Sequence, residues 1–144
     1  MSELRDLPAN LVVTTGPGTD PACFGPQQAN VLLAAYLPHT LLLPSCALVV
    51  SQGGAGIMFC ALANGLPQLM LPQGADQFLN ADACTSAGAA LALTAKELTA
   101  DAVGAAASRL LVEPHFATAA AVVVRAEIGS RPDAGAVLAE LLSE

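Results

Sequence analysis

Residues 46–80, which read CALVVSQGGAGIMFCALANGLPQLMLPQGADQFLN, decide the fold of this chain. An apolar run at residues 47–50 is followed at once by the glycine-rich segment SQGGAG (51–56), after which apolar residues recur at helical spacing. The glycines therefore lie where a parallel strand ends and a helix begins. At such a junction unpaired backbone N–H groups and the positive end of the helix dipole converge, and glycine lets an anion approach closely. The pattern favours a phosphate site, although a tight turn alone would use the same glycines.

The second half of this stretch adds a pair of polar residues. Another apolar strand is expected at residues 68–71, followed by a loop at 72–75, and Asp76 and Gln77 stand where the next helix should start. In an open parallel sheet ligands bind at the carboxyl ends of the strands, so both loops should lie on the same rim. Asp76 accepts hydrogen bonds and Gln77 both donates and accepts, which suits the vicinal hydroxyls of a sugar. The alternative is that Asp76 is only a helix N-cap, and for this residue taken by itself that is the better explanation.

The rest of the chain alternates between strand-like and helix-like segments. This alternation predicts an α/β fold whose parallel sheet is covered by helices on both faces. Thr94 and Glu97 have the spacing of a capping box at a helix start. Further strands are expected at residues 10–15, 31–35 and 89–93, and helices at 2–7, 39–43, 94–113, 116–123 and 134–141. The last three helices should turn these apolar residues to the core: Val103, Ala106, Ala107, Leu110, Phe116, Ala119, Ala120, Val123, Ala134, Val137, Leu138 and Leu141.

Composition limits the classes of function. The 144 residues fit one domain, and no uninterrupted apolar run approaches the roughly 18 residues of a membrane span. The first residues show no secretion signal, so the cytoplasm is the expected location. A net charge of −7 argues against nucleic acid and anionic membranes as partners, whereas backbone amides can still bind phosphate. The spacing of Cys23, Cys46, Cys60 and Cys84 predicts reduced, mostly buried thiols. The sequence shows no cluster of carboxylates that would hold a metal ion, so no metal is expected.

Several motifs in a fixed order resemble a known family. GGAG (53–56), ALANGLPQLMLP (61–72) and GADQ (74–77) are similar to the donor-binding signature of glycosyltransferases that use nucleotide sugars. TGPG (15–18) and NVLLAAYLPH (30–39) extend the likeness over nearly the whole chain. The chain resembles the C-terminal, donor-binding domain of a family 1 glycosyltransferase with the GT-B fold, in the bacterial branch that glycosylates antibiotics and macrolides. The resemblance implies a Rossmann-like parallel sheet flanked by helices.

The resemblance also implies a role for individual residues. Tyr36 would offer a platform to the nucleobase, the backbone of Leu37 would bind the base edge, and His39 would lie near the nucleoside. Ordinary core packing for Tyr36 and an exposed helix start for His39 remain alternatives. Asp76 and Gln77 would hold the sugar hydroxyls. Backbone N–H groups for the pyrophosphate would come from Gly54, Ala55, Gly56 and Ile57.

Three positions depart from the family pattern. Gln52 stands where relatives have a histidine that contacts the pyrophosphate. Glutamine keeps a donor but cannot carry a positive charge, and a charge-assisted hydrogen bond contributes about 1.5–3 kcal/mol against about 1 kcal/mol for a neutral one. Ile57 replaces a serine or threonine, and Cys60 stands where many relatives have a carboxylate for the ribose. The donor site is therefore expected to bind more weakly than in relatives.

Two parts of the family architecture have no counterpart in these 144 residues. One is the strand, loop and helix that precede the segment equivalent to residues 10–15. The other is the acceptor-binding domain, whose histidine is the general base; neither His39 nor His115 matches it, and a structural role is expected for His115. The chain is therefore expected to be a single donor-binding domain that is not a competent transferase by itself. An uncovered sheet edge should make it self-associate into a homo-oligomer.

The implied reaction is an inverting transfer without a metal. A (deoxy)hexose would move from a TDP- or UDP-sugar to a hydroxyl of a natural-product acceptor, and this chain would stabilise the departing diphosphate. Two alternatives stay open. One is a degenerate, non-catalytic homologue that acts as a binding or scaffolding partner. The other is an unrelated dinucleotide-binding module, which the absence of a third glycine after Gly56 disfavours.

Overall fold

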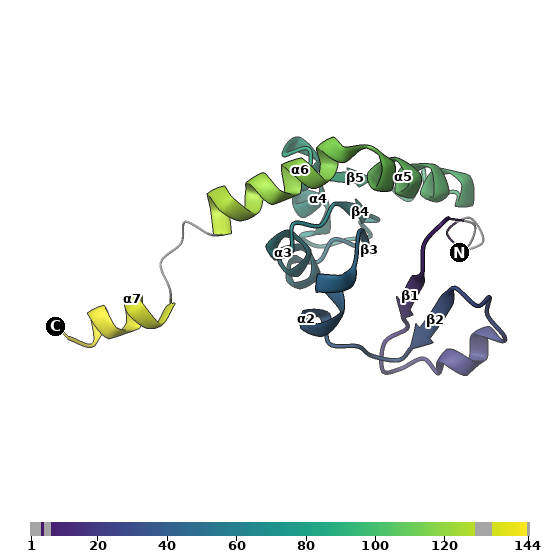
Figure 1. Cartoon of the computed structure of the whole chain (residues 1–144), viewed down its shortest axis with the longest axis horizontal. Coiled ribbons are helices and arrows are strands. Elements are labelled where there is room, and N and C mark those ends of the chain that lie inside the picture. The colour runs from purple at the N-terminus through teal and green to yellow at the C-terminus, as the bar shows by residue number, and fades with distance from the viewer. Residues whose placement is uncertain (1–3, 5–6, 129–133, 144) are drawn as a thin grey trace.

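The computed structural model describes residue 4, residues 7–128 and residues 134–143. Strands and helices alternate, as Figure 1 shows, and each expected strand is present. The strands are β1 (Leu11–Thr14), β2 (Val31–Ala34), β3 (Val49–Ser51), β4 (Gln68–Met70) and β5 (Ala90–Ala92). The α-helices are α2 (His39–Leu42), α3 (Ala55–Ala63), α4 (Gln77–Ser86), α5 (Ala100–Val112), α6 (Pro114–Val123) and α7 (Ala134–Leu141). Short 3-10 turns, η1 (Pro21–Phe24) and η2 (Leu43–Ser45), and a π-helical turn, η3 (Val124–Ile128), complete the order.

The strands form two parallel sheets, where the sequence analysis expected one. β1 pairs with β2, and β3, β4 and β5 form a separate sheet in that order. Each pairing is parallel, as the alternation of strands and helices predicted. Among the described residues no strand pairs with both sheets, so strand hydrogen bonds do not connect β1–β2 with β3–β4–β5.

Helices cover both faces of the three-stranded sheet. Leu69 and Met70 are adjacent in β4 and both are fully buried, on opposite faces. Met70 packs with apolar residues of α3, α4 and α6, whereas Leu69 packs with those of α5 and with Phe116 at the start of α6. Leu4 and Leu7 also pack against the α5 side. This part of the molecule therefore has the predicted two-faced cover.

The two-stranded sheet is much less covered. The three apolar residues of β1 are only half-buried, and Leu32 in β2 is 57% exposed. The N–H groups of Leu11 and Thr15 point toward β2, where they donate to Asn30 and Ala34. Because the backbone alternates direction along a strand, the N–H groups of Val12 and Thr14 point to the opposite, open edge. In a central strand of a parallel sheet, apolar residues such as those of β1 would be buried on both faces. The apolar residues of β1 lack this complete cover.

The helix predictions hold in most places. The expected stripe of α5 is buried or packed in the core, and so is that of α6. The predicted capping box at Thr94 is wrong, because α5 begins at Ala100 and its N-cap is Thr99, whose hydroxyl accepts from the Ala102 N–H at 3.1 Å. Thr94 and Glu97 form an isolated turn. There the Glu97 carboxylate accepts from the N–H of Thr94 at 2.9 Å and from the Thr94 hydroxyl at 2.7 Å. The proton of this hydroxyl is therefore donated to Glu97.

The two ends of the chain fit the predictions less well. Leu138 in α7 is 56% exposed, so its predicted place in the core is wrong, while the side chains of Ala134, Val137 and Leu141 lie outside the described residues. In Figure 1 α7 lies apart from the other helices, with no helix packed on it. Of the helix expected at residues 2–7, only Leu4 and Leu7 are described.

Two further observations concern composition. All four cysteines are free, as predicted, but only Cys84 is buried and Cys23 is exposed. Burial raises the pKa of the Cys84 thiol. No single helix in the described part of the chain meets the length and hydropathy of a membrane span; α5 joined to residues 114–126 meets them only as a pair bent by 73°.

Candidate functional site

The loops that follow β3 and β4 lie beside each other on the same edge of the three-stranded sheet. Ser51 at the end of β3 is in register with Met70 at the end of β4, and the Leu71 N–H donates to the Ser51 carbonyl at 2.8 Å. The glycine loop and the segment around Asp76 therefore start side by side. This confirms the shared rim that the sequence predicted.

The glycine loop requires glycine at position 53. Gly53 has φ +83°, and a Cβ there would lie 3.3 Å from Met70 Cε and 3.5 Å from the Gln77 carbonyl oxygen. The loop is therefore packed directly onto β4 and the start of α4. The Gly53 N–H donates to Ser51 Oγ at 3.1 Å, which fixes the backbone as it leaves the strand.

The start of α3 exposes unpaired backbone donors. Gly54 is the N-cap and offers no side chain to cap the helix, and the first intrahelical bond runs from Met58 N–H to the Gly54 carbonyl at 3.0 Å. The N–H groups of Ala55, Gly56 and Ile57 consequently have no partner within the helix. A Cβ on Gly56 would meet nothing within 4 Å, so the space beside this turn is open. This geometry can bind an anion.

Gln52 lies next to this helix start. Its side chain is exposed, and its Nε2 atom is 3.4 Å from the position that a Cβ on Gly54 would take. It therefore stands over the same backbone turn as the donors of α3. An uncharged amide donor occupies the position at which the family resemblance implies a histidine.

Asp76 and Gln77 lie at the start of α4, after a residue in an unusual conformation. Ala75 has φ +53°, the left-handed region that a residue with a Cβ rarely adopts. Asp76 is the N-cap residue of α4, as its alternative interpretation stated, but its side chain makes no capping hydrogen bond. Gln77 Oε1 accepts from the N–H groups of Gln73 at 2.9 Å and Gly74 at 3.3 Å. Gln77 thus holds its own loop and keeps its amide NH₂ group for a ligand.

Asn80 is a residue that the sequence analysis did not single out. Its Nδ2 donates to the Gly53 carbonyl at 2.9 Å and to Asp76 Oδ2 at 3.0 Å. The contact with Asp76 could have been inferred from the helical spacing of four residues. The contact with Gly53 is 27 residues distant in sequence, and no local pattern indicates it.

The residues implied for the nucleoside follow β2 in the other sheet. Tyr36 is 71% exposed, so the alternative of core packing is wrong, and His39 is exposed at the start of α2, as its alternative interpretation stated. Leu37 is half-buried, and its backbone N–H and C=O have no hydrogen-bond partner among the described residues. The exposed side chains of Tyr36 and His39 and the unpaired backbone groups of Leu37 are therefore available to a ligand.

Of two cavities in the described part of the molecule, one lies beside the proposed rim. One of about 270 Å³ lies at the carboxyl ends of β4 and β5, next to the Asp76 loop, and is lined by Leu71, Pro72, Gln73, Leu93, Ala95 and Leu98. The other, of about 370 Å³, lies at the far end of α3 near Arg125 and does not touch the rim. Within the described ranges, no three His, Cys, Asp or Glu side chains gather into a metal-binding group.

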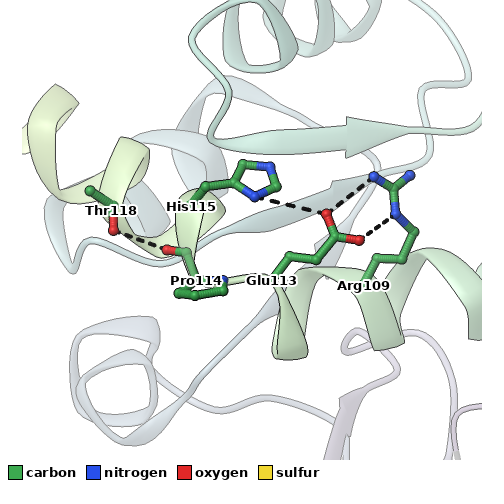
Figure 2. A network of polar contacts seen from close by, with 5 residues as sticks. All are labelled: Arg109, Glu113, Pro114, His115 and Thr118. Carbon is green, nitrogen blue, oxygen red and sulfur yellow. Dashed lines mark hydrogen bonds and ion pairs between the residues drawn. The ribbon is translucent and has the colours of Figure 1, made fainter.

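A separate polar network lies where α5 meets α6 (Figure 2). Arg109 and Glu113 form a two-pronged ion pair with N–O distances of 2.8 and 3.2 Å, and His115 Nδ1 lies 3.8 Å from Glu113 Oε2. Thr118 Oγ1 donates to the Pro114 carbonyl at 3.0 Å. The hydrogen bond from Arg109 lowers the pKa of Glu113, and Glu113 raises the pKa of Arg109. The network lies on the surface at the bend between the helices, and a structural role for His115 stays a prediction.

Known proteins match this chain along its length. Aklavinone 7-beta-L-rhodosaminyltransferase of Streptomyces galilaeus is 41% identical over 103 residues, which are 72% of this chain and 23% of that protein. Tylactone mycaminosyltransferase of Streptomyces fradiae is 32% identical over 141 residues, 98% of this chain and 31% of that protein. The crystal structure of glycosyltransferase VinC in complex with DTDP superposes with a TM-score of 0.89 at 31% identity, covering 99% of this chain and 35% of VinC.

These matches confirm the α/β fold as that of the C-terminal part of GT-B glycosyltransferases. The chain spans only 23% to 35% of the length of the three proteins named. A family model described as "Erythromycin biosynthesis protein CIII-like, C-terminal domain" matches residues 1–143. This chain therefore belongs to the family of the erythromycin biosynthesis protein CIII-like C-terminal domain.

Proposed function

We propose that this chain is the nucleotide-sugar-binding portion of an inverting glycosyltransferase that moves a (deoxy)hexose to a hydroxyl of a natural-product acceptor. The observation that carries the proposal is the open helix start at Gly54–Ile57 beside Asp76 and Gln77 on one rim. The relatives are named as a rhodosaminyltransferase and a mycaminosyltransferase, which supports the transfer of a sugar, and the DTDP in the VinC complex supports a thymidine diphosphate donor. A uridine diphosphate donor is the second candidate.

In this proposal the chain supplies the leaving-group site. The N–H groups of residues 54–57 and the dipole of α3 would stabilise the negative charge that develops on the diphosphate as the glycosidic bond breaks. Asp76 would accept from sugar hydroxyls, and the free NH₂ group of Gln77 would donate to them. Tyr36, Leu37 and His39 would hold the nucleoside. The acceptor and its general base would be bound by a domain outside these residues.

We propose that the site needs no metal. Four backbone donors and a helix terminus provide the positive potential that a cation would otherwise give. Binding of the nucleotide should therefore be the same in a chelating buffer as in one with added Mg²⁺. A requirement for the cation would contradict this part of the proposal.

The test is calorimetric titration of the chain with thymidine and uridine diphosphates. The decisive variant is Gly56→Leu, because a side chain at this position has room in the folded protein but would fill the space of the phosphate. It should abolish binding without lowering the melting temperature. Ala63→Leu, on an exposed position at the other end of α3, is the matched control and should bind as the wild type does. Equal binding by both variants would place the nucleotide elsewhere.

The non-catalytic homologue is the less favoured alternative, since the proteins that match this chain are named as transferases. The two readings differ in one measurement. Hydrolysis or transfer that releases free nucleoside diphosphate, once an acceptor domain is supplied in trans, supports the transferase. Nucleotide binding without any release under the same conditions supports the scaffold.

The cytoplasm is the proposed location of the protein, which cell fractionation would test.

We also propose that the chain self-associates through the open edges of its sheets, with a second copy as the partner. The backbone groups of Val12 and Thr14 in β1, and of Val50 in β3, point away from their paired strands. Light scattering at micromolar concentration should show a dimer or larger species. Thr14→Lys, which puts a charge on the exposed end of this edge, should shift the chain toward monomer, whereas Thr40→Lys on exposed α2 should not. A wild-type monomer would contradict the proposal.

A further inference from the structure

Asn80 joins the two loops that form the proposed donor site. It is half-buried at the fourth position of α4, and one amide group, Nδ2, donates both of its protons. One proton goes to the Gly53 carbonyl at 2.9 Å and the other to Asp76 Oδ2 at 3.0 Å. Both partners are acceptors only, so the NH₂ side of the amide must face them and its orientation is determined.

The bond to Gly53 sets the direction of a donor in the phosphate loop. In a trans peptide the carbonyl and the following N–H point to opposite sides. Holding the Gly53 carbonyl toward α4 therefore turns the Gly54 N–H away from α4. The left-handed φ of +83° at Gly53 gives this peptide a freedom that a tether has to remove.

The bond to Asp76 sets the direction of the carboxylate. Oδ2 is engaged by Asn80, and the side chain makes no bond to the helix start. The carboxylate is thus held in one orientation with Oδ1 left for a ligand. The spacing of four residues at the start of α4 brings Asp76 next to Asn80.

We infer that Asn80 is a positioning residue, which aligns the phosphate-binding backbone and the sugar-binding carboxylate with each other through a single amide. The inference rests on the proposed function and deepens it. Its chemistry is specific to an amide, since an aspartate at this position would set a carboxylate against two acceptors. Asn80→Asp is nearly identical in size and reverses the interaction from attractive to repulsive.

The matched control is Asn64→Asp. Asn64 also donates its Nδ2 to a backbone carbonyl, that of Cys60 at 2.8 Å, and it stands at the exposed end of α3 away from the rim. It adds the same charge to the chain without touching either loop. Any effect of net charge on nucleotide binding therefore appears in both variants.

The experiment measures the binding of thymidine diphosphate and of thymidine diphosphate-glucose to the wild type, Asn80→Asp, Asn64→Asp and Asp76→Asn. Asn80→Asp should weaken the diphosphate by about tenfold, as expected for the loss of one well-placed donor. It should also abolish the additional affinity that the glucose confers, as Asp76→Asn does. Asp76→Asn should leave the affinity for the diphosphate alone nearly unchanged. A merely structural role would lower both affinities equally and keep their ratio.

A second readout needs no ligand. Hydrogen exchange of the amides of residues 53–58 should become faster in Asn80→Asp and stay unchanged in Asn64→Asp. If the wild type binds neither nucleotide, the proposed function fails, while faster exchange in Asn80→Asp still supports the alignment of the loop. If the wild type binds both and Asn80→Asp matches it in affinity, ratio and exchange, the positioning role is overturned.

Discussion

The two sheets of this domain differ in how completely their neighbours bury them. In the three-stranded sheet each residue of β4 is buried, and helices cover both faces. In the two-stranded sheet the apolar residues of β1 are half-buried, and Leu32 and Tyr36 are exposed at 57% and 71%. The strand sequences do not predict this difference, because LVVT in half-buried β1 is at least as apolar as QLM in buried β4. An apolar sequence therefore predicts that a segment forms a strand. How far that strand is buried depends on which neighbouring elements are present.

The proposed site is divided between these two regions. The glycine loop, Asp76 and Asn80 belong to the tightly packed sheet, whereas Tyr36, Leu37 and His39 belong to the loosely packed one. Phosphate and sugar contacts are therefore expected to be preorganised, and contacts with the nucleobase less so. The following predictions test this difference, and they run from the largest expected effect to the smallest.

The largest difference concerns the cores. Leu69→Ala should lower the free energy of unfolding by about 2–5 kcal/mol, because the Leu69 side chain of β4 is fully buried against α5. Val13→Ala in half-buried β1 should cost only about 1 kcal/mol or less. Urea denaturation under monomeric conditions measures both. Equal costs would mean that β1 is covered as well as β4.

Two glycines with nearly the same backbone conformation compare the two loops. Gly53, after β3, has φ +83° and Gly16, after β1, has φ +82°. Alanine at either position should cost about 1–2 kcal/mol through the left-handed backbone alone. Gly53→Ala should cost more, because its Cβ would lie 3.3 Å from Met70 Cε, whereas a Cβ on Gly16 would have nothing within 4 Å. Thermal denaturation measures the stability, and nucleotide binding should fall only in Gly53→Ala. An equal loss of stability would mean that the Met70 side chain simply moves.

Restoring a histidine at position 52 should strengthen nucleotide binding. A protonated imidazole beside the helix start would replace a neutral hydrogen bond by a charge-assisted one, a gain of about 1 kcal/mol or about fivefold in affinity. The gain in Gln52→His should be larger at pH 6 than at pH 8, since histidine titrates between them. Gln28→His, on an exposed residue before β2, is the control in the other sheet. A gain that does not depend on pH would argue against a charge effect.

The smallest effect concerns the exposed ion pair between Arg109 and Glu113 at the end of α5. Arg109 holds the pKa of Glu113 below that of a free glutamate. A depressed pKa in the folded state stabilises the protein above the unfolded-state pKa, and this stabilisation is lost as the pH falls through the folded-state pKa. Glu113→Gln should therefore lower the melting temperature slightly at neutral pH, and the difference should vanish in acid. Glu140→Gln, on exposed α7, should behave as the wild type at both pH values.

The elements and the rim of the site could be predicted from the sequence because both depend on local patterns. Apolar runs fixed the five strands, and the glycines after residue 50 placed the phosphate loop at a strand end. The start of α5 could not be placed this way, since Thr94 and Glu97 have the spacing of a capping box and only the folded structure shows that Thr99 is the hydroxyl that accepts from an N–H of the helix. The role of Asn80 depends on a carbonyl in another loop. The exposure of Leu138 depends on what α7 packs against.

The division of the sheet has a consequence for cooperativity. Regions with few buried contacts open more readily than the core, so residues 11–34 are expected to exchange amide hydrogens sooner than residues 49–92. A nucleoside diphosphate that contacts Tyr36 with its base and Gly54 with its phosphates would tie both regions to one ligand. At a hundredfold excess over its dissociation constant such a ligand stabilises the bound form by about 2.7 kcal/mol. The bound nucleotide would then couple the two regions, so that they unfold together in one transition.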